Sequence, residues 1–275
     1  MTPVKPPEDG WHWTEWWAEL TGTAVLLFAI VTARYWAIRG GPPWSDPAIT
    51  IAIIGMAAGL AVLGVAVSPL GRRSGAHLNP AVTIGLWLQK VTSRADLAGY
   101  CTAQIAGGIA GVVAARAWGA QVARPPVHWA VIAPAAWMPP AAAAGIEAAA
   151  TSVQLLLLYA ALASSRHHQW APHVACCMLT VFIIAVAPLS GGGFSPVRGL
   201  APDLMAGTYP ALWIYFVGPV VGSAAAAAAI LAWRWRPITG KLRHDAAIMC
   251  HMRCELPHRV KAPAQTNGTG AAHNG

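Results

Sequence analysis

The chain has 275 residues, of which 56% are hydrophobic and only 10% are charged, and its formal net charge is +8. This composition is typical of an integral membrane protein. The basic residues lie between apolar runs and in the C-terminal tail rather than on one soluble face, which argues against a nucleic-acid-binding protein. The five cysteines show no disulfide framework of a secreted protein.

The chain divides into a polar leader (residues 1–15), a largely apolar region (16–236) and a basic tail (237–275), which we expect to be largely disordered. The apolar region contains six segments long enough to span a bilayer, at about 16–38, 49–69, 97–117, 141–163, 172–188 and 211–233. These segments form two halves, residues 16–117 and 141–233. The proline-rich connection between the halves is too interrupted to span.

The basic residues predict how the chain is oriented. Four of the 18 lysines and arginines fall on the side away from the termini, and one more, Arg198, falls inside the membrane. The four are Arg34, Arg39, Arg116 and Arg124. All the others lie on the side of the termini. The positive-inside rule therefore predicts cytoplasmic termini, and we expect a multi-pass protein of a bacterial-type inner (plasma) membrane.

Two short stretches have the same pattern at membrane depth. Residues 74–83 read Ser-Gly-Ala-His-Leu-Asn-Pro-Ala-Val-Thr, and residues 190–200 read Ser-Gly-Gly-Gly-Phe-Ser-Pro-Val-Arg-Gly-Leu. In each, glycine-rich backbone leads to an N-cap residue, a proline at the first helical position and a short helical run. Irregular backbone at this depth must be buried in protein or line a wet cavity. Two such segments in corresponding places predict an inverted repeat with a site near the bilayer midplane.

The first stretch resembles the first Asn-Pro-Ala loop of the aquaporin, or major intrinsic protein, family. The second resembles the family's Asn-Pro-Ala-Arg loop, with Ser195 in place of asparagine and Val197 in place of alanine. The likeness covers about residues 15–236. It implies an all-α membrane protein with six transmembrane helices and two re-entrant half-helices. It also implies a homotetramer in lipid that passively conducts water and small uncharged solutes, with no catalytic residue and no cofactor.

The resemblance assigns roles to individual residues. The central constriction falls on Asn79, Pro80, Ala81, Ser195, Pro196 and Val197, and Asn79 and Ser195 are each expected to cap a half-helix. Backbone carbonyls along the pore are expected from Gly75, Ala76, His77, Gly191, Gly192 and Gly193. Glu19 and Glu147 would accept hydrogen bonds from the loop backbone, the alternative being that they face water at the interface. Arg198 takes the selectivity position, the alternative being a salt bridge to Asp203 or another acid.

Registration against the family places Ala58, Ile183 and Gly192 beside Arg198 as the other filter residues, with a shift of one residue left open at Ala58. This small and apolar set resembles the filter of the nodulin-26-like subgroup, which is associated with boric acid and other metalloid hydroxides. Glycerol facilitators usually carry aspartate after the arginine, where this chain has Gly199, so that subtype fits poorly. The resemblance to the nodulin-26-like filter implies passage of boric acid, arsenous acid or glycerol-like molecules.

Three other interpretations remain. One is an orthodox water-selective channel, and a second is a proton- or ion-coupled transporter that uses Glu19 and Glu147. The third is a metal-sensing membrane protein that works through its tail, where residue types that bind metals occur at near-helical spacing. They are Cys250, His251, Cys254 and His258, with His244 nearby. Because nothing in the sequence forces a closed four-ligand geometry, we expect no metal site there.

Overall fold

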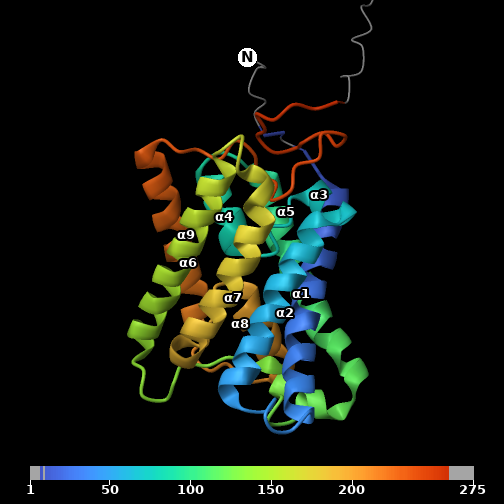
Figure 1. Cartoon of the computed structure of the whole chain (residues 1–275), viewed down its shortest axis with the longest axis vertical. Coiled ribbons are helices and arrows are strands. Elements are labelled where there is room, and N and C mark those ends of the chain that lie inside the picture. Colours follow the sequence, from blue (N-terminus) through green and yellow to red (C-terminus); the bar gives the residue numbers. More distant parts are fainter. Residues whose placement is uncertain (1–6, 9, 260–275) are drawn as a thin grey trace, which may run out of the picture.

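The computed structural model describes residues 7–8 and 10–259, and within this range the fold is helical (Figure 1). Six helices are long and apolar enough to cross a membrane. They are α1 (Trp13–Arg39), α2 (Pro47–Val67), α5 (Arg94–Ala114), α6 (Pro140–Leu162), α7 (Ala171–Ser190) and α9 (Trp213–Trp233). The shorter helices are α3 (Pro69–Ser74), α4 (Pro80–Leu88) and α8 (Pro196–Ala206). The expected six spans and two half-helices are therefore confirmed, and α3 is an additional short helix.

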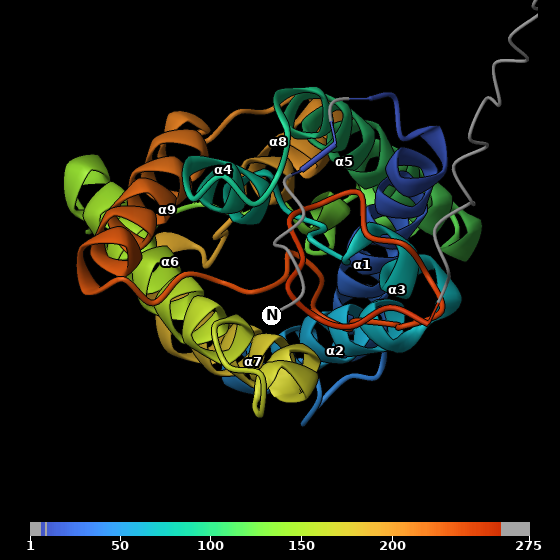
Figure 2. The same ribbon diagram turned by 90° about the horizontal axis from the view of Figure 1, so that it is seen from above.

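The two halves of the chain repeat one arrangement. Helix α1 packs along α5 as α6 packs along α9, and α2 packs along α7 where the two halves meet (Figure 2). The half-helices are exchanged between the halves, because α4 packs against α9 and α8 packs against α5. This exchange brings the N-termini of α4 and α8 to the middle of the bundle from opposite faces.

Glycines allow the helices within each half to approach closely. A Cβ atom at Gly107 of α5 would overlap the backbone oxygen of Leu20 of α1. In the second half, a Cβ atom at Gly222 of α9 would overlap the backbone oxygen of Ala148 of α6. Small residues are the usual means of close helix packing in a bilayer, where apolar side chains gain little from leaving lipid.

The connection between the halves does not span the bundle, as expected. It contains three short 3₁₀ turns, at Ala115–Trp118, Ala120–Ala123 and His128–Ala130. The Arg34 side chain of α1 fastens it by donating to the carbonyl oxygens of Val127 and Pro126 at 2.9 and 2.8 Å.

The start of the tail differs from the expected disorder. Residues 237–259, which we call the C-terminal strap, pack across the end of the bundle at which α1 begins and α9 ends (Figure 2). Lys241 and Met252 in the strap are almost completely buried. The strap can pack because its backbone finds partners on the bundle: the Ile238 amide donates to Leu162 O and the Arg253 amide to Val91 O. The rest of the tail, residues 260–275, lies outside the described residues.

Gly107→Ala should destabilise the protein by about 1–3 kcal/mol, because the new methyl group must push α1 and α5 apart. Gly145→Ala is the matched control, since Gly145 also lies in a spanning helix but has open space around its Cβ position. Thermal unfolding of both variants in detergent measures the difference. Equal melting temperatures would show that α1 and α5 do not depend on this close approach.

Candidate functional site

A buried glutamate holds the re-entrant loop of the first half. The carboxylate of Glu19 accepts hydrogen bonds from the amides of His77 and Leu78 at 3.0 and 2.7 Å, and from the Ser74 hydroxyl at 2.7 Å. Gln104 donates a further hydrogen bond at 2.8 Å. At this depth no water is present to accept hydrogen bonds from these donors. The carboxylate accepts them instead and so fixes the path of the loop.

Glu147 does the same in the second half. It accepts from the amides of Gly193 and Phe194 at 3.0 and 2.7 Å, and from the Ser190 hydroxyl at 2.6 Å. Glu19 and Glu147 are both completely buried. The structure therefore agrees with the loop-supporting interpretation of both residues and not with a position in water at the interface.

Two tyrosines complete this arrangement, and the sequence analysis missed them. Tyr100 donates to the carbonyl oxygen of Ser74 at 2.6 Å, and Tyr215 donates to that of Ser190 at 2.8 Å. Each tyrosine follows its serine by almost the same interval, 26 residues in the first half and 25 in the second. That equal spacing is the signal by which an alignment of the two halves could have found the pair.

The two loops also have the same backbone conformation. The φ angles of Gly75 and Gly191 are 105° and 100°, and those of Leu78 and Phe194 are both 52°. Left-handed backbone costs a residue with a side chain roughly 1–2 kcal/mol. The hydrogen bonds to the buried carboxylates offset this cost at Leu78 and Phe194, whose own amides are among the donors.

The symmetry ends at the centre of the bundle. The Asn79 side chain caps α4 by accepting from the Ala81 amide at 2.9 Å, and its Nδ2 group donates to the Phe194 carbonyl at 2.8 Å. Asn79 thus joins the two re-entrant loops. Ser195 occupies the corresponding position, with φ −157° and ψ 133° against −154° and 123° for Asn79.

Our expectation that Ser195 caps its half-helix is wrong, because its side chain makes no capping hydrogen bond to α8. The reason is its backbone conformation. Ser68 and Ser93 do cap helices in this chain, and their φ angles are −71° and −73°. The more extended φ of Ser195 suits the longer asparagine side chain, whereas it leaves the serine hydroxyl out of reach of the first helical turn.

A cavity of about 100 Å³ lies between the two loops, and the four proposed filter residues all line it: Ala58, Ile183, Gly192 and Arg198. Arg198 is only 9% exposed. Within the described part of the chain its Nη1 nitrogen has no hydrogen-bond partner, and neither does any carboxylate oxygen of Asp203. The alternative of an Arg198–Asp203 salt bridge therefore does not hold in this structure.

The other residues of the predicted pore fall into two groups, those that line the cavity and those that are buried behind its wall. Asn79, Ser195, Ala76, His77 and Gly193 line the cavity. Pro80, Ala81, Pro196 and Val197 are buried behind its wall, where Val197 packs against Gly108 of α5.

Two of the predicted carbonyl residues, Gly75 and Gly191, are not among the described residues that line this cavity. The Gly75 carbonyl has another partner, since it accepts from the Leu242 amide of the C-terminal strap at 3.0 Å. Leu242 itself lines the cavity, a contact that no feature of the sequence indicated.

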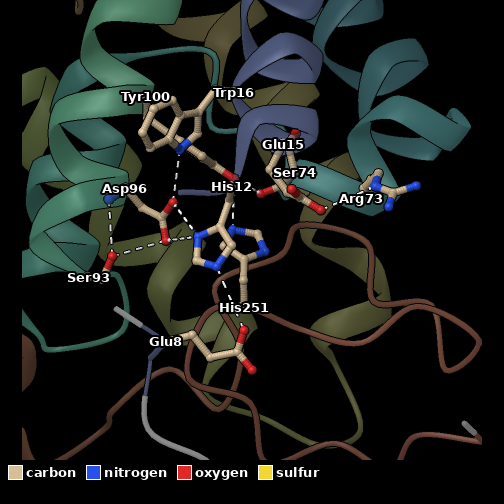
Figure 3. Close-up of polar contacts among 10 residues, drawn as sticks. All are labelled: Glu8, His12, Glu15, Trp16, Arg73, Ser74, Ser93, Asp96, Tyr100 and His251. Carbon is tan, nitrogen blue, oxygen red and sulfur yellow. Dashed lines mark hydrogen bonds and ion pairs between the residues drawn. The ribbon is translucent and has the colours of Figure 1, made fainter. Parts of the chain in front are cut away.

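The strap and the leader meet beside the first loop (Figure 3). There the buried Asp96 accepts from Trp16 Nε1 at 2.9 Å and lies 2.8 Å from His12 Nδ1. The Tyr100 hydroxyl, which donates to the loop, lies 3.0 Å from His251 Nε2 of the strap. Burial lowers the pKa of Lys241, whose ammonium donates to the Arg72 carbonyl at 3.2 Å.

The known proteins to which the chain is similar include aquaporins and an aquaglyceroporin. The chain is 31% identical over 210 residues to aquaporin NIP1-3 of Oryza sativa subsp. japonica, covering 76% of this chain and 70% of the relative. It is 30% identical over 232 residues to aquaporin NIP3-1 of the same organism, covering 82% and 69%. Among solved structures, the X-ray structure of the aquaglyceroporin from Plasmodium falciparum matches with a TM-score of 0.66 at 20% identity, covering 79% of this chain and 94% of the other.

The family comparison covers most of the chain. The profile described as "Major intrinsic protein" matches residues 9–230. This range includes both re-entrant loops, both supporting glutamates and Arg198. The chain belongs to the major intrinsic protein family.

Proposed function

We propose that the chain is a passive channel whose filter admits compact neutral molecules with several hydroxyl groups, such as boric acid, arsenous acid and glycerol, together with water. One observation carries the proposal: Ala58, Ile183, Gly192 and Arg198 line the same cavity. Small side chains at two of these positions leave width, and Ile183 supplies an apolar wall. The guanidinium of Arg198, which has no ion-pair partner in Asp203, supplies donors for a hydroxyl-bearing solute and repels cations.

The midpoint of the pore supports the same selectivity. With α8 uncapped by Ser195, the first amides of α8 remain available as donors beside the positive end of its dipole. A permeating hydroxyl or water oxygen can accept from them, whereas a cation is repelled. The short serine side chain also leaves more room than a second asparagine would.

The coupled-transporter alternative finds little support in this geometry. A coupling carboxylate must be free to exchange protons or ions with the pore. Glu19 and Glu147 instead each accept three or more hydrogen bonds from the loops and helices around them. Releasing either would leave buried backbone amides without partners. We therefore propose that solute moves down its own gradient, with no reaction and no cofactor.

We further propose that the channel is a homotetramer in a membrane, with one pore per subunit and both termini in the cytoplasm. The tetramer rests on the family resemblance. The orientation rests on the excess of lysine and arginine on the terminal side of the spans.

We propose that the filter is wider than one water molecule, and Ala58→Trp should therefore block the passage of larger solutes. Solute flux should fall about tenfold or more, which corresponds to an added barrier of about 1.4 kcal/mol, while water flux falls much less. A stopped-flow panel of water, glycerol, urea, boric acid and arsenous acid on the same proteoliposomes measures this. Leu60→Trp, at an exposed position of the same helix, is the control. Equal losses for water and solutes would place the narrowing elsewhere and would favour the water-selective alternative.

Arg198→Ala should leave the protein folded but admit protons or small cations, because the fixed charge in the filter is lost. Arg116→Ala, in an exposed turn outside the bundle, should change nothing. Proton flux across proteoliposomes, followed with a pH-sensitive dye inside the vesicles, tests both variants. Unchanged proton exclusion and unchanged solute ranking for Arg198→Ala would remove this residue from the filter.

Ser195→Asn should stabilise the protein by about 1 kcal/mol, since the longer side chain can cap α8 as Asn79 caps α4. It should also lower solute flux relative to water flux by narrowing the midpoint. The reciprocal Asn79→Ser should destabilise by about 1–3 kcal/mol, because it removes the α4 cap and leaves the buried Phe194 carbonyl unpaired. Melting temperatures and permeability ratios measure both changes. Loss of folding in Ser195→Asn would contradict the open space inferred at Ser195.

A further inference from the structure

The C-terminal strap forms part of the wall of the cavity through Leu242. Its ribbon runs from the end of α9 over the middle of the bundle toward α3 (Figure 2). Leu242 of the strap is 2% exposed and lines the cavity together with Leu155, Leu158 and Leu179. The Leu242 amide holds the Gly75 carbonyl, and His77 Nε2 holds the Gly240 carbonyl at 2.9 Å. A solute leaving the filter on this side therefore meets the strap.

Four residues of the strap form a cluster. One ligand atom from each of His244, Cys250, Cys254 and His258 lies within 4.8 Å of the others. The Nδ1 atom of His244 is 3.8 Å from the sulfurs of both Cys250 and Cys254. The rings of His244 and His258 lie edge to face, with 5.0 Å between their centroids. His251, which the sequence groups with them, points instead to Tyr100.

We propose that His244, Cys250, Cys254 and His258 form a tetrahedral Zn²⁺ site that locks the C-terminal strap across the mouth of the pore. The part of this proposal that concerns the pore rests on the channel function proposed above. The part that concerns the metal stands on the strap alone.

The geometry suits Zn²⁺. Zinc binds thiolates at about 2.3 Å and imidazoles at about 2.0–2.1 Å, so tetrahedral ligand atoms lie roughly 3.3–3.8 Å apart. Two of the separations are already 3.8 Å, and the others, which are at most 4.8 Å, need to shorten by about 1.5 Å at most. Two cysteines and two histidines are a common set of ligands for structural zinc, and two thiolates neutralise its charge.

Groups around the cluster orient the ligands. The Nε2 atom of His244 lies 3.2 Å from the carbonyl oxygen of Pro257, which makes Nε2 the donor and leaves Nδ1 to bind the metal. Ligating histidines typically have such a partner on the second nitrogen. The hydroxyl oxygen of Thr239 lies 3.8 Å from the Cys254 sulfur, and the backbones of these two residues form a β-bridge.

The ligands are placed to control Leu242. This residue lies between Thr239, which pairs with Cys254, and the ligand His244. An ion that fixes His244 to Cys254 therefore fixes both ends of the short segment carrying Leu242. The strap contains little regular structure, so this segment otherwise depends on its contacts with the bundle, such as the hydrogen bond from the Leu242 amide to Gly75. Zinc binding thus reinforces these contacts, and loss of zinc makes it easier for Leu242 to leave the cavity.

Tyr100 connects the strap to the first re-entrant loop (Figure 3). Its hydroxyl proton goes to the Ser74 carbonyl, so the oxygen accepts from His251 Nε2 of the strap. His251 lies between the ligands Cys250 and Cys254 in the chain. The metal cluster and the first re-entrant loop are therefore connected by two hydrogen bonds.

The metal site is tested on the full-length protein in detergent, stripped with a chelator under reducing conditions and titrated with Co²⁺ and then Zn²⁺. One Co²⁺ per chain should give the intense visible absorption of a tetrahedral thiolate site, and Zn²⁺ should bleach it. In the double variant Cys250→Ser with Cys254→Ser the signal should be lost. His244→Ala should weaken Zn²⁺ binding by at least the roughly 10- to 100-fold that loss of an outer-shell partner causes. The matched control, Cys176→Ser with Cys177→Ser, removes two cysteines of α7 outside the cluster and should bind as the unchanged protein does.

An octahedral Co²⁺ spectrum, binding that survives loss of both strap cysteines, or a Cys250–Cys254 disulfide that forms in place of metal binding would overturn the site. Trypsin gives a second reading, because zinc should protect the strap from cleavage after Arg243 and Arg253. Equal cleavage with and without zinc would overturn the locking.

The gate is tested by water permeability of proteoliposomes with zinc or chelator on both sides. Zinc should lower permeability several-fold in the unchanged channel and have no effect on the double cysteine variant. Leu242→Ala should still bind zinc but conduct at the higher rate in its presence. If zinc binds but does not change the water flux, the proposed gating is wrong and the proposed metal site still holds. If no variant, Leu242→Ala included, conducts under any condition, the proposed channel function itself fails.

Discussion

The structure depends on the pairing of buried carboxylates with backbone amides that have no other partner. A re-entrant loop gives up the internal hydrogen bonds of a helix at a depth where water cannot replace them. Glu19 and Glu147 supply the missing acceptors, each to two successive amides and one serine hydroxyl. Once the loops are fixed, the N-termini of α4 and α8 must meet at the centre. The cavity, and with it the proposed filter and constriction, follows from that meeting.

Burying a charge in a membrane is costly, and the arrangement shows how the cost is offset. Each carboxylate is the acceptor of charge-assisted hydrogen bonds, which are stronger than neutral ones. The bonds are also made within one half of the chain, from the first helix of that half to its own loop. Each half therefore contains the group that stabilises its least regular segment. This self-sufficiency is what allows the same design to occur twice in one chain with opposite orientation.

Much of this architecture is predictable from the sequence, because the features that decide it are local. Asn79-Pro80 and Ser195-Pro196 mark helix starts wherever they occur, and Glu19 and Glu147 stand out as carboxylates in apolar runs. Ser195 shows where such reasoning fails. Serine is a good cap in general, but whether it reaches the helix depends on a φ angle that the loop sets. The strap fails for another reason: its order comes from contacts with Val91 and Leu162, far away in the chain, and no local pattern records them.

The attachment of the strap to both halves has a consequence for biosynthesis. Its backbone partners include Gly75 and Val91 from the first half and Leu162 from the second. The strap is also the last of these segments to leave the ribosome. It can dock only when both halves have been inserted and have closed on each other, because before that its partners lie apart. The strap therefore docks only in a chain whose two halves are correctly assembled. A chain with a misplaced half would keep its C-terminus exposed to quality-control proteases.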